Sequence, residues 1–196
     1  MKPIFDFLLA AALLVPLLPI MFIEAVAIAV DSRGFVLFVQ PRVGRGGRSF
    51  RMYKFRTMIP AEHSLDAQGK VKPDDERITR LGRFLRRTSL DELPQLFNIL
   101  KGDMSFVGPR PTLQYQVDRY DAFQRRRLEV KPGVTGLAQI RGRNSLSWEE
   151  KIRHDVEYVE RRSFLLDLRI LLSTAAVVVR RDGIEFTKND DISRLD

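Results

Sequence analysis

The sequence predicts a mostly α-helical fold with a small β-hairpin. We expect the N-terminal segment to be a re-entrant membrane element, a helix, a break and a second helix, that packs on a compact cytoplasmic domain. Amphipathic helices of that domain are expected to lie at the membrane interface. Three features support this: an uncharged apolar run near the N-terminus, amphipathic segments with helical spacing after it, and two strand-like segments around a glycine-rich turn. The 196 residues suit one well-cored domain plus an appendage. We therefore expect a membrane hairpin over residues 1–30, a domain over 31–183 and a polar tail over 184–196.

The charge balance indicates a polyanionic partner. Lysine and arginine total 33 against 25 acidic residues, which gives a net charge of +8. Seven basic residues and no acidic one lie between Ser32 and Ala61, and five arginines without an acid lie from Arg77 to Arg87. Nucleic acid, an anionic membrane face and phosphorylated small molecules all fit this pattern, as does a solvated basic surface. The absence of cysteine excludes disulfides and thiolate metal sites.

The N-terminal apolar run is expected to enter the membrane without crossing it. Phe7–Ile23 holds 17 uncharged residues, whereas a straight spanning helix needs about 20. Pro16 and Pro19 lie in its middle, and each removes a backbone donor and clashes with the preceding turn. Two half-helices, Ile4–Val15 and Leu17–Val30, would then enter and leave by the same leaflet.

Two alternatives exist for this run. A secretory signal peptide has a basic n-region, but only Lys2 precedes the run and Asp6 lies where that region would be. A buried core helix is the second alternative, although two prolines three residues apart suit it poorly. In either membrane form, the positive-inside bias keeps the arginine-rich remainder in the cytoplasm.

The second apolar segment, Phe164–Val179, is expected to be a helix that packs on the core or lies at the membrane interface. Asp167 and Arg169 interrupt it, and Arg180 and Arg181 follow it. Charged side chains inside so short a segment argue against a span.

A β-hairpin is expected after the membrane run. Val36–Gln40 and Phe50–Met58 have strand-like composition around the turn VGRGGR. Lys54 and Arg56 are two residues apart on the second segment, so we expect them on one face. The polar stretch Ile59–Glu76 is expected to be a mobile loop.

Four amphipathic helices are expected in the rest of the domain, and a glycine-rich connector, Lys131–Asn144, separates the last two. The helices are Arg77–Thr88, with Ile78, Leu81 and Leu85 on its apolar face; Leu90–Lys101, with Leu93, Leu96, Phe97 and Leu100 inward; Thr112–Leu128; and Trp148–Arg161, opened by a Ser147–Glu150 capping box.

The segment Ser89–Gln95 carries the strongest chemical signal. The plain interpretation is that Ser89 and Glu92 only form a capping box. However, adjacent carboxylates at a helix N-terminus are favoured in their ionised form, and Arg86 and Arg87 lie just before them. An ionised Asp91 could attack a phosphorus centre to give an acyl phosphate, and its neighbour could help to hold Mg²⁺.

A rigid arginine follows a few residues later. Arg110 stands between Pro109 and Pro111, so its backbone is restrained and its guanidinium group can be aimed. Guanidinium suits bidentate recognition of phosphate. The plain alternative is a proline-rich turn with a solvent-facing arginine.

These motifs resemble those of a known family. With YKFRTM before it and KPGVTGLAQIRGRN after it, the run SLDELPQLFNILKGDMSFVGPRP resembles the bacterial sugar transferases, the monotopic phosphoglycosyl transferases. The likeness covers residues 5–183 and is greatest to small members without additional N-terminal membrane helices, such as the bacillosamine-phosphate transferase of bacterial N-glycosylation. It implies a catalytic domain over residues 31–183 on the cytoplasmic face of a bacterial inner membrane.

The resemblance also implies roles for single residues. Asp91 matches the family's nucleophile, which attacks the β-phosphorus of a UDP-sugar, releases UMP and holds the sugar phosphate covalently. Glu92 matches the second carboxylate beside the required Mg²⁺, so both carboxylates are implied metal ligands. A polyprenyl phosphate, usually undecaprenyl phosphate, then takes the sugar phosphate. The family's phosphate- and nucleotide-binding positions are matched by Lys54, Arg56, Arg86, Arg110 and Arg143, and a further acidic position is matched by Asp155.

The sequence departs from the family at the membrane break. The family commonly uses a Ser-Pro pair, whose hydroxyl group can satisfy carbonyls freed by the kink. Here the pair is Leu18-Pro19, with an additional Pro16, so another group has to reach those carbonyls.

Two rival functions lead to different expectations. An inactive membrane-bound nucleotide-sugar-binding protein would need the arginines but no nucleophile. A nucleic-acid-binding protein would interleave aromatic stacking platforms with its basic residues, and only Tyr53 and Phe55 match, so we expect no nucleic-acid partner. The sequence predicts neither the donor sugar nor the oligomeric state, but Ile59–Glu76 and Leu137–Ser145 are candidate donor-selecting segments.

Overall fold

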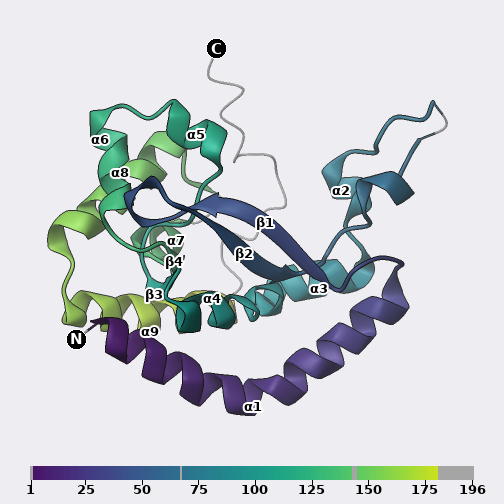
Figure 1. Cartoon of the computed structure of the whole chain (residues 1–196), viewed down its shortest axis with the longest axis horizontal. Helices are drawn as coiled ribbons and strands as arrows, with labels where there is room; N and C mark the ends of the chain where they lie inside the picture. The colour runs from purple at the N-terminus through teal and green to yellow at the C-terminus, as the bar shows by residue number, and fades with distance from the viewer. Residues whose placement is uncertain (1, 67, 143–144, 181–196) are drawn as a thin grey trace.

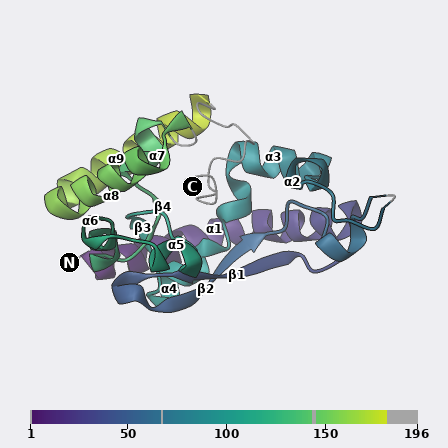
Figure 2. The same cartoon turned by 90° about the horizontal axis from the view of Figure 1, so that it is seen from above.

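The computed structural model describes residues 2–66, 68–142 and 145–180, so Arg143 and the tail over residues 184–196 lie outside the described residues. The fold is mostly helical, as predicted, with two small two-stranded sheets, and a long N-terminal helix runs along one edge (Figure 1). Figure 2 shows α7, α8 and α9 gathered toward the N-terminal end of this helix, and α2 and α3 toward its C-terminal end.

Helix α1 (Lys2–Asp31) is continuous through Pro16 and Pro19. It is therefore not interrupted into the two half-helices expected from the sequence. Instead it bends in its middle, with its concave side toward the rest of the molecule (Figure 1). The missing donors of the two prolines account for a bend in this region, because each removes one hydrogen bond from the helical ladder.

The burial pattern of α1 is the reverse of that in a water-soluble helix. Its two internal acids, Asp6 and Glu24, are buried, while most of its large apolar side chains are exposed, among them Phe7, Leu18 and Phe22. An 18-residue stretch of it has a mean hydropathy of 2.5, and the helix is long and apolar enough to cross a membrane. An exposed apolar surface of this extent indicates membrane association and argues against a buried core helix.

The predicted hairpin is confirmed. Strands β1 (Leu37–Val43) and β2 (Ser49–Phe55) pair antiparallel, with Phe38 opposite Lys54. The 3₁₀ turn η1 (Arg45–Gly47) joins them, and Gly46 adopts a φ of 68°, which glycine accepts without strain.

Helix α3 (Arg80–Thr88) packs against α1 and the end of β2. Leu81 and Leu85 lie in one apolar cluster with Met21 and Ile28 of α1, as their spacing predicted. Gly82 is required for this packing, because a Cβ atom there would lie 2.0 Å from the carbonyl oxygen of Thr57. The preceding segment, expected to be a loop, contains the short elements η2 (Ala61–His63) and α2 (Asp74–Arg77).

The expected helix over residues 90–101 is divided into η3 (Leu90–Glu92) and α4 (Gln95–Lys101). Leu96 and Ile99 are buried in the cluster that joins α4 to α1 and β2. Phe97 was expected inward but is 37% exposed, because it projects from a different side of the helix than these two residues.

The second sheet was not predicted. Strands β3 (Ser105–Val107) and β4 (Gly133–Thr135) pair in parallel and bring the Pro-Arg-Pro segment beside the glycine-rich connector. Their close approach needs glycine, since a Cβ atom on Gly133 would lie 2.1 Å from the backbone nitrogen of Gly108. The connector continues into the unexpected helix α7 (Leu137–Arg141).

The prediction of one helix over residues 112–128 is wrong. The structure has α5 (Gln114–Asp118), α6 (Ala122–Arg125) and η4 (Arg126–Glu129) instead. Asp121 causes the restart, because its side chain accepts a hydrogen bond from the backbone of Gln124 and so caps a new helix.

The last two helices are confirmed. Helix α8 (Trp148–Arg161) begins with the Ser147–Glu150 capping box, and α9 (Phe164–Arg180) follows it. Helix α9 has exposed apolar residues next to the start of α1, where the rings of Phe5 and Phe164 meet edge to face at 5.2 Å. The exposed apolar surfaces of α1 and α9 therefore adjoin.

Candidate active site

The two predicted carboxylates lie in the tight turn between α3 and α4. Ser89 adopts a left-handed conformation with φ 58°, which ends α3 and starts η3. The Ser89 side chain makes no capping hydrogen bond to η3, so the capping-box interpretation of Glu92 is wrong. Glu92 is instead available for ion pairs.

Glu92 is held by two cations from distant parts of the chain. Its Oε1 atom accepts hydrogen bonds from Lys54 Nζ of β2 at 2.7 Å and from Arg110 Nη2 at 3.1 Å. Burial alone would raise the pKa of Glu92, but Lys54 and Arg110 outweigh it and lower that pKa to about 2. Glu92 is therefore ionised at neutral pH.

Asp91 is buried beside this cluster, with 8% of its surface exposed. Burial and the negative charge of Glu92 raise the pKa of Asp91 to about 6, against the opposing effect of Lys54, Arg86 and Arg110. A carboxylate that is ionised at pH 7, but is incompletely compensated, is suited to attack an electrophile.

Arg86 comes from the inner side of α3 and completes the group of cations. Its Nε atom donates to the hydroxyl group of Thr57 at 2.9 Å, and its charge interacts with that of Asp91. Thr57 was not predicted as a site residue, although it lies in the YKFRTM motif quoted above.

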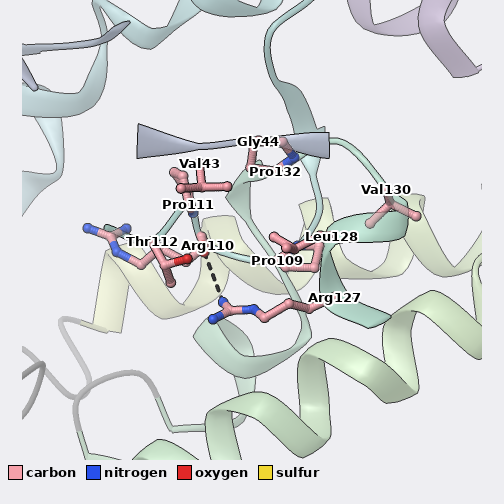
Figure 3. A pocket seen from close by; sticks show the side chains of 10 residues that line it. All are labelled: Val43, Gly44, Pro109, Arg110, Pro111, Thr112, Arg127, Leu128, Val130 and Pro132. Atoms are coloured by element: carbon pink, nitrogen blue, oxygen red, sulfur yellow. Dashed lines mark hydrogen bonds between the residues drawn. The ribbon is translucent and has the colours of Figure 1, made fainter. Parts of the chain in front are cut away.

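The backbone of Arg110 is fixed from behind by Arg127. Arg127 Nη2 donates to the carbonyl oxygen of Arg110 at 2.9 Å, as Figure 3 shows. Arg127 also donates to the hydroxyl group of Tyr120 at 2.6 Å, and that group in turn donates to Thr112 at 3.2 Å. The space behind the Pro-Arg-Pro loop is filled, because the cavity drawn in Figure 3 has a volume of only about 10 Å³.

Asp155 lies with Arg127 behind the Pro-Arg-Pro loop and is not part of the cluster around Asp91. It is 2% exposed, and its Oδ2 atom lies 2.5 Å from Arg127 Nη2. Burial raises the pKa of Asp155 to about 6, although Arg127 acts in the opposite direction. The structure therefore connects Asp155 to Arg110 through Arg127, a residue that the sequence gave no specific reason to select.

Arg56 binds backbone carbonyl groups at the end of α1. Its guanidinium group donates to the carbonyl oxygens of Ser32, at 2.7 Å, and of Arg33, just beyond the end of α1. Carbonyl groups at a helix C-terminus lack intrahelical donors and carry partial negative charge, so an arginine is stabilising there. Arg56 and Lys54 therefore serve different partners, and Arg143 lies outside the described residues.

The carboxylates also fit a divalent cation that shares its shell with substrate phosphates. Among the residues that the structure describes, no three acidic or histidine side chains form a metal cluster. Mg²⁺ commonly takes only one or two protein carboxylates and completes its shell with water and phosphate oxygens, so Asp91 and Glu92 could hold it. Both carboxylate oxygens of Glu24 are buried without a hydrogen-bond partner in the described chain, and Glu24 lies close enough to Asp91 for the two groups to interact electrostatically.

The chain is similar to known bacterial proteins along nearly its whole length. Residues 1–181 match the sequence profile of the family described as bacterial sugar transferase. The chain is 45% identical over 195 residues to the uncharacterized sugar transferase EpsL of Bacillus subtilis (strain 168), covering all of this chain and 95% of that protein.

Two further relatives carry names that state a reaction. The undecaprenyl-phosphate galactose phosphotransferase of Salmonella typhimurium (strain LT2) is 40% identical over 198 residues, which cover 93% of this chain and 41% of that protein. The UDP-glucose:undecaprenyl-phosphate glucose-1-phosphate transferase of Xanthomonas campestris pv. campestris is 43% identical over 187 residues, which cover 91% and 38%. The chain thus spans about two fifths of these longer relatives. A special likeness to bacillosamine-phosphate transferases stays a prediction. With nearly its whole length matching the profile, the chain belongs to the bacterial sugar transferase family.

Proposed function

We propose that the protein is a phosphoglycosyl transferase that moves a sugar 1-phosphate from a UDP-sugar to a polyprenyl phosphate such as undecaprenyl phosphate. The observation that carries this proposal is the position of Asp91, a buried carboxylate surrounded by Lys54, Arg86 and Arg110. The names of the relatives in Salmonella and Xanthomonas support the same reaction class. Phosphoryl transfer is catalysed chiefly by positioning and by neutralising charge, and this arrangement offers both.

In the first step, a carboxylate oxygen of Asp91 attacks the β-phosphorus of the UDP-sugar. The bond from that phosphorus to the bridging oxygen breaks, and the oxygen leaves with its electron pair as part of UMP. The sugar phosphate stays on Asp91 as an acyl phosphate. Lys54 and Arg110 are held by Glu92 at the positions where the phosphate charge would lie.

In the second step, an oxygen of the lipid phosphate attacks the same phosphorus. The bond to Asp91 breaks, the free carboxylate returns, and the product is a lipid diphosphate sugar. Mg²⁺ bound by Asp91 or Glu92 would supply additional positive charge for the diphosphate oxygens.

We further propose that α1 is re-entrant and enters the inner leaflet of a bacterial cytoplasmic membrane. Both ends of α1 bind the same domain: Lys2 Nζ pairs with Asp167 of α9 at 2.5 Å, and Arg56 of the segment after β2 binds the carbonyl groups past the C-terminal end. Because one folded domain lies on one side of a membrane, both ends of the helix are on that side. The exposed apolar surface of α9 would lie at the interface.

The test of the proposed function is trapping of the covalent intermediate. Purified protein is mixed with a UDP-sugar and Mg²⁺ without lipid acceptor, and its intact mass and tryptic peptides are measured. We expect a sugar-phosphate adduct on Asp91 together with one equivalent of UMP, and neither product for Asp91→Asn. Turnover of donor and acceptor without an adduct would overturn the covalent route, whereas donor binding without UMP release would favour an inactive nucleotide-sugar-binding protein.

The donor sugar is found by the same assay. The names of the relatives in Salmonella and Xanthomonas include galactose and glucose, so a panel of UDP-sugars containing these, N-acetylglucosamine and bacillosamine derivatives is scored by UMP release. We propose that Ile59–Glu76 and Leu137–Ser145 select the donor. Exchange of these segments with those of a relative would then change the preferred sugar, and unchanged preference would refute this assignment.

A further inference from the structure

The outward side of α3 carries a cavity that the proposed chemistry does not use. Its volume is about 260 Å³, and Arg80, Arg83, Phe84, Arg87 and Thr88 line it. Three of the five lining residues are therefore cationic, and none is acidic. Within the described part of the chain, the cavity is a concentrated source of positive charge separate from the cluster around Asp91.

The arginines share one side of the helix because of their spacing. Arg80, Arg83 and Arg87 are three and four residues apart, which places them on one face, while Leu81 and Leu85 on another face pack toward α1. All three arginines are exposed. Among the described residues, neither Arg80 nor Arg83 forms an ion pair, so their charges are available to an external anion.

The lining indicates the chemical class of that anion. Guanidinium groups bind phosphate oxygens through paired N–H donors, and Thr88 can add a hydroxyl group. Phe84 is 55% exposed and offers an apolar surface next to the arginines. The cavity lining has no amide or carboxylate side chain to bind a nucleobase or sugar hydroxyl groups, so a phosphate joined to an apolar chain fits it better than a nucleotide sugar.

The number of arginines favours a phosphate monoester over a phosphodiester. A monoester carries nearly two negative charges at neutral pH, because its second pKa is near 6, whereas a diester carries one. The two charges of Arg80 and Arg83, beside that of Arg87, therefore match the terminal phosphate of a polyprenyl phosphate better than the headgroup phosphate of an ordinary phospholipid.

The helix that carries the cavity contacts both the membrane element and the reactive carboxylate, through faces other than the arginine face. Helix α3 packs on the C-terminal half of α1 through Leu85, Met21 and Ile28. The next residue along α3, Arg86, interacts with Asp91. A lipid phosphate held on the outside of α3 would have its chain near the apolar surface of α1 and its phosphate one helical face away from the site of transfer.

We propose that the α3 cavity binds the phosphate monoester of the lipid acceptor before transfer. This inference rests on the proposed function for its role in the reaction. It assigns a binding site to the second substrate that is distinct from the residues engaging the nucleotide diphosphate.

The test compares Arg80→Gln/Arg83→Gln with a matched control, Arg48→Gln/Arg51→Gln, which removes two exposed arginines from the β1–β2 hairpin. Each protein is reconstituted in nanodiscs of neutral phospholipid. Adduct formation from UDP-sugar alone measures the first step, and the KM for polyprenyl phosphate measures the acceptor. Loss of two charge-assisted contacts should raise that KM by at least about tenfold in the α3 variant and leave adduct formation and the control unchanged.

Several results would overturn the inference. These are an unchanged acceptor KM, an equal rise in the control, or a proportional loss of adduct formation, which would place the arginines at the donor site. A KM difference that appears only after phosphatidylglycerol is added would assign the cavity to bulk phospholipid instead.

A binding measurement separates this inference from the proposed function. Affinity for a short polyprenyl phosphate is measured in nanodiscs by ³¹P NMR titration without donor, so it needs no turnover. Weaker binding by the α3 variant alone supports the cavity even if no adduct forms on Asp91. Equal affinity for all three proteins refutes it even if the adduct does form.

Discussion

Asp91 and Glu92 are neighbours in the sequence but have opposite electrostatic environments. Glu92 is held by Lys54 and Arg110, and its pKa falls to about 2. Asp91 is buried and has no direct ion pair with any described residue, and its pKa rises to about 6. This difference supports a division of roles in which Glu92 positions cations and Asp91 supplies the reactive oxygen.

The raised pKa of Asp91 has a consequence for stability. The folded protein binds a proton at Asp91 more tightly than the unfolded chain, so stability contributed by this group is present below pH 3.8 and is lost as pH rises toward about 6. Asp91→Asn should therefore increase the free energy of unfolding at pH 7.5 by up to about 3 kcal/mol while abolishing adduct formation. Denaturation midpoints in micelles check this. The gain in the free energy of unfolding should disappear near pH 4. If Asp91→Asn were less stable than wild type at pH 7.5, this prediction would be wrong.

Removal of Glu92 should separate two effects. Glu92→Gln removes a negative charge that raises the pKa of Asp91, so the pH profile of adduct formation should shift to lower pH. It also releases Lys54 and Arg110, and this loss of positioning should lower the maximal rate by about 10²-fold. Rapid-quench measurement of the adduct between pH 5 and 9 tests both effects. Glu92→Asp is the control that keeps the charge, and an unshifted profile in Glu92→Gln would refute the electrostatic account.

At the scale of elements, the Pro-Arg-Pro loop is rigid because α8 supports it through η4. Asp155 of α8 pairs with Arg127 of η4, and Arg127 binds the backbone of Arg110. A buried ion pair stabilises little by itself, but loss of one partner leaves an uncompensated charge. The pair is therefore a positioning device for Arg110.

This arrangement predicts different outcomes for single and paired substitutions. Asp155→Asn should destabilise the protein by about 3–5 kcal/mol, because it leaves Arg127 buried without its counter-ion. Arg127→Met/Asp155→Leu should recover most of that stability but still raise the KM for the UDP-sugar, because Arg110 loses its backbone support. Melting curves and donor kinetics give the two readouts. Wild-type kinetics in the stable double variant would show that Arg110 needs no such support.

Helix α1 is bent where its two prolines lie, and the bend is expected to decide its course through the membrane. Pro16→Ala/Pro19→Ala restores two backbone donors and should straighten the helix. A straight helix of 30 residues is long enough to cross the hydrocarbon core, so a fraction of the variant should become spanning. To measure this, Pro3→Cys is added to the variant. We expect the cysteine at residue 3 to become more accessible to labelling from the outer surface of the membrane. Unchanged accessibility would mean that the domain contacts alone set the course of α1.

At the scale of the whole molecule, both ends of α1 are bound to one domain. This predicts that both ends face the same side of the membrane. The chain has no cysteine, so Pro3→Cys and Asp31→Cys each give a single labelling site. Both should react with an impermeant maleimide in inverted inner-membrane vesicles and not in intact spheroplasts, whereas Phe22→Cys should react slowly in each. Opposite labelling of the two ends would establish a spanning helix.

Local features of the sequence were sufficient for much of the fold. Strand-like composition on both sides of a glycine-rich turn predicted the β1–β2 hairpin, and apolar periodicity with the Ser147 cap predicted α8. These elements form from contacts between residues near in sequence, which periodicity and capping report directly. The helix expected over residues 112–128 is divided for a local reason too, because Asp121 caps a new helix in its middle.

The sequence by itself determined the adjacent pair of carboxylates, the apolar N-terminal helix and the charge that fits a phosphorylated partner, since each depends on residue type and local spacing. Only the tertiary structure decided which cations serve them. Lys54 and Arg110 meet at Glu92 across 38 and 18 residues, while Arg56 binds the end of α1 and Asp155 binds Arg127. The parallel β3–β4 pair and the α3 cavity likewise arise from backbone approach and helix packing. Such pairings depend on which segments pack together, and residue spacing along the chain carries no information about that choice.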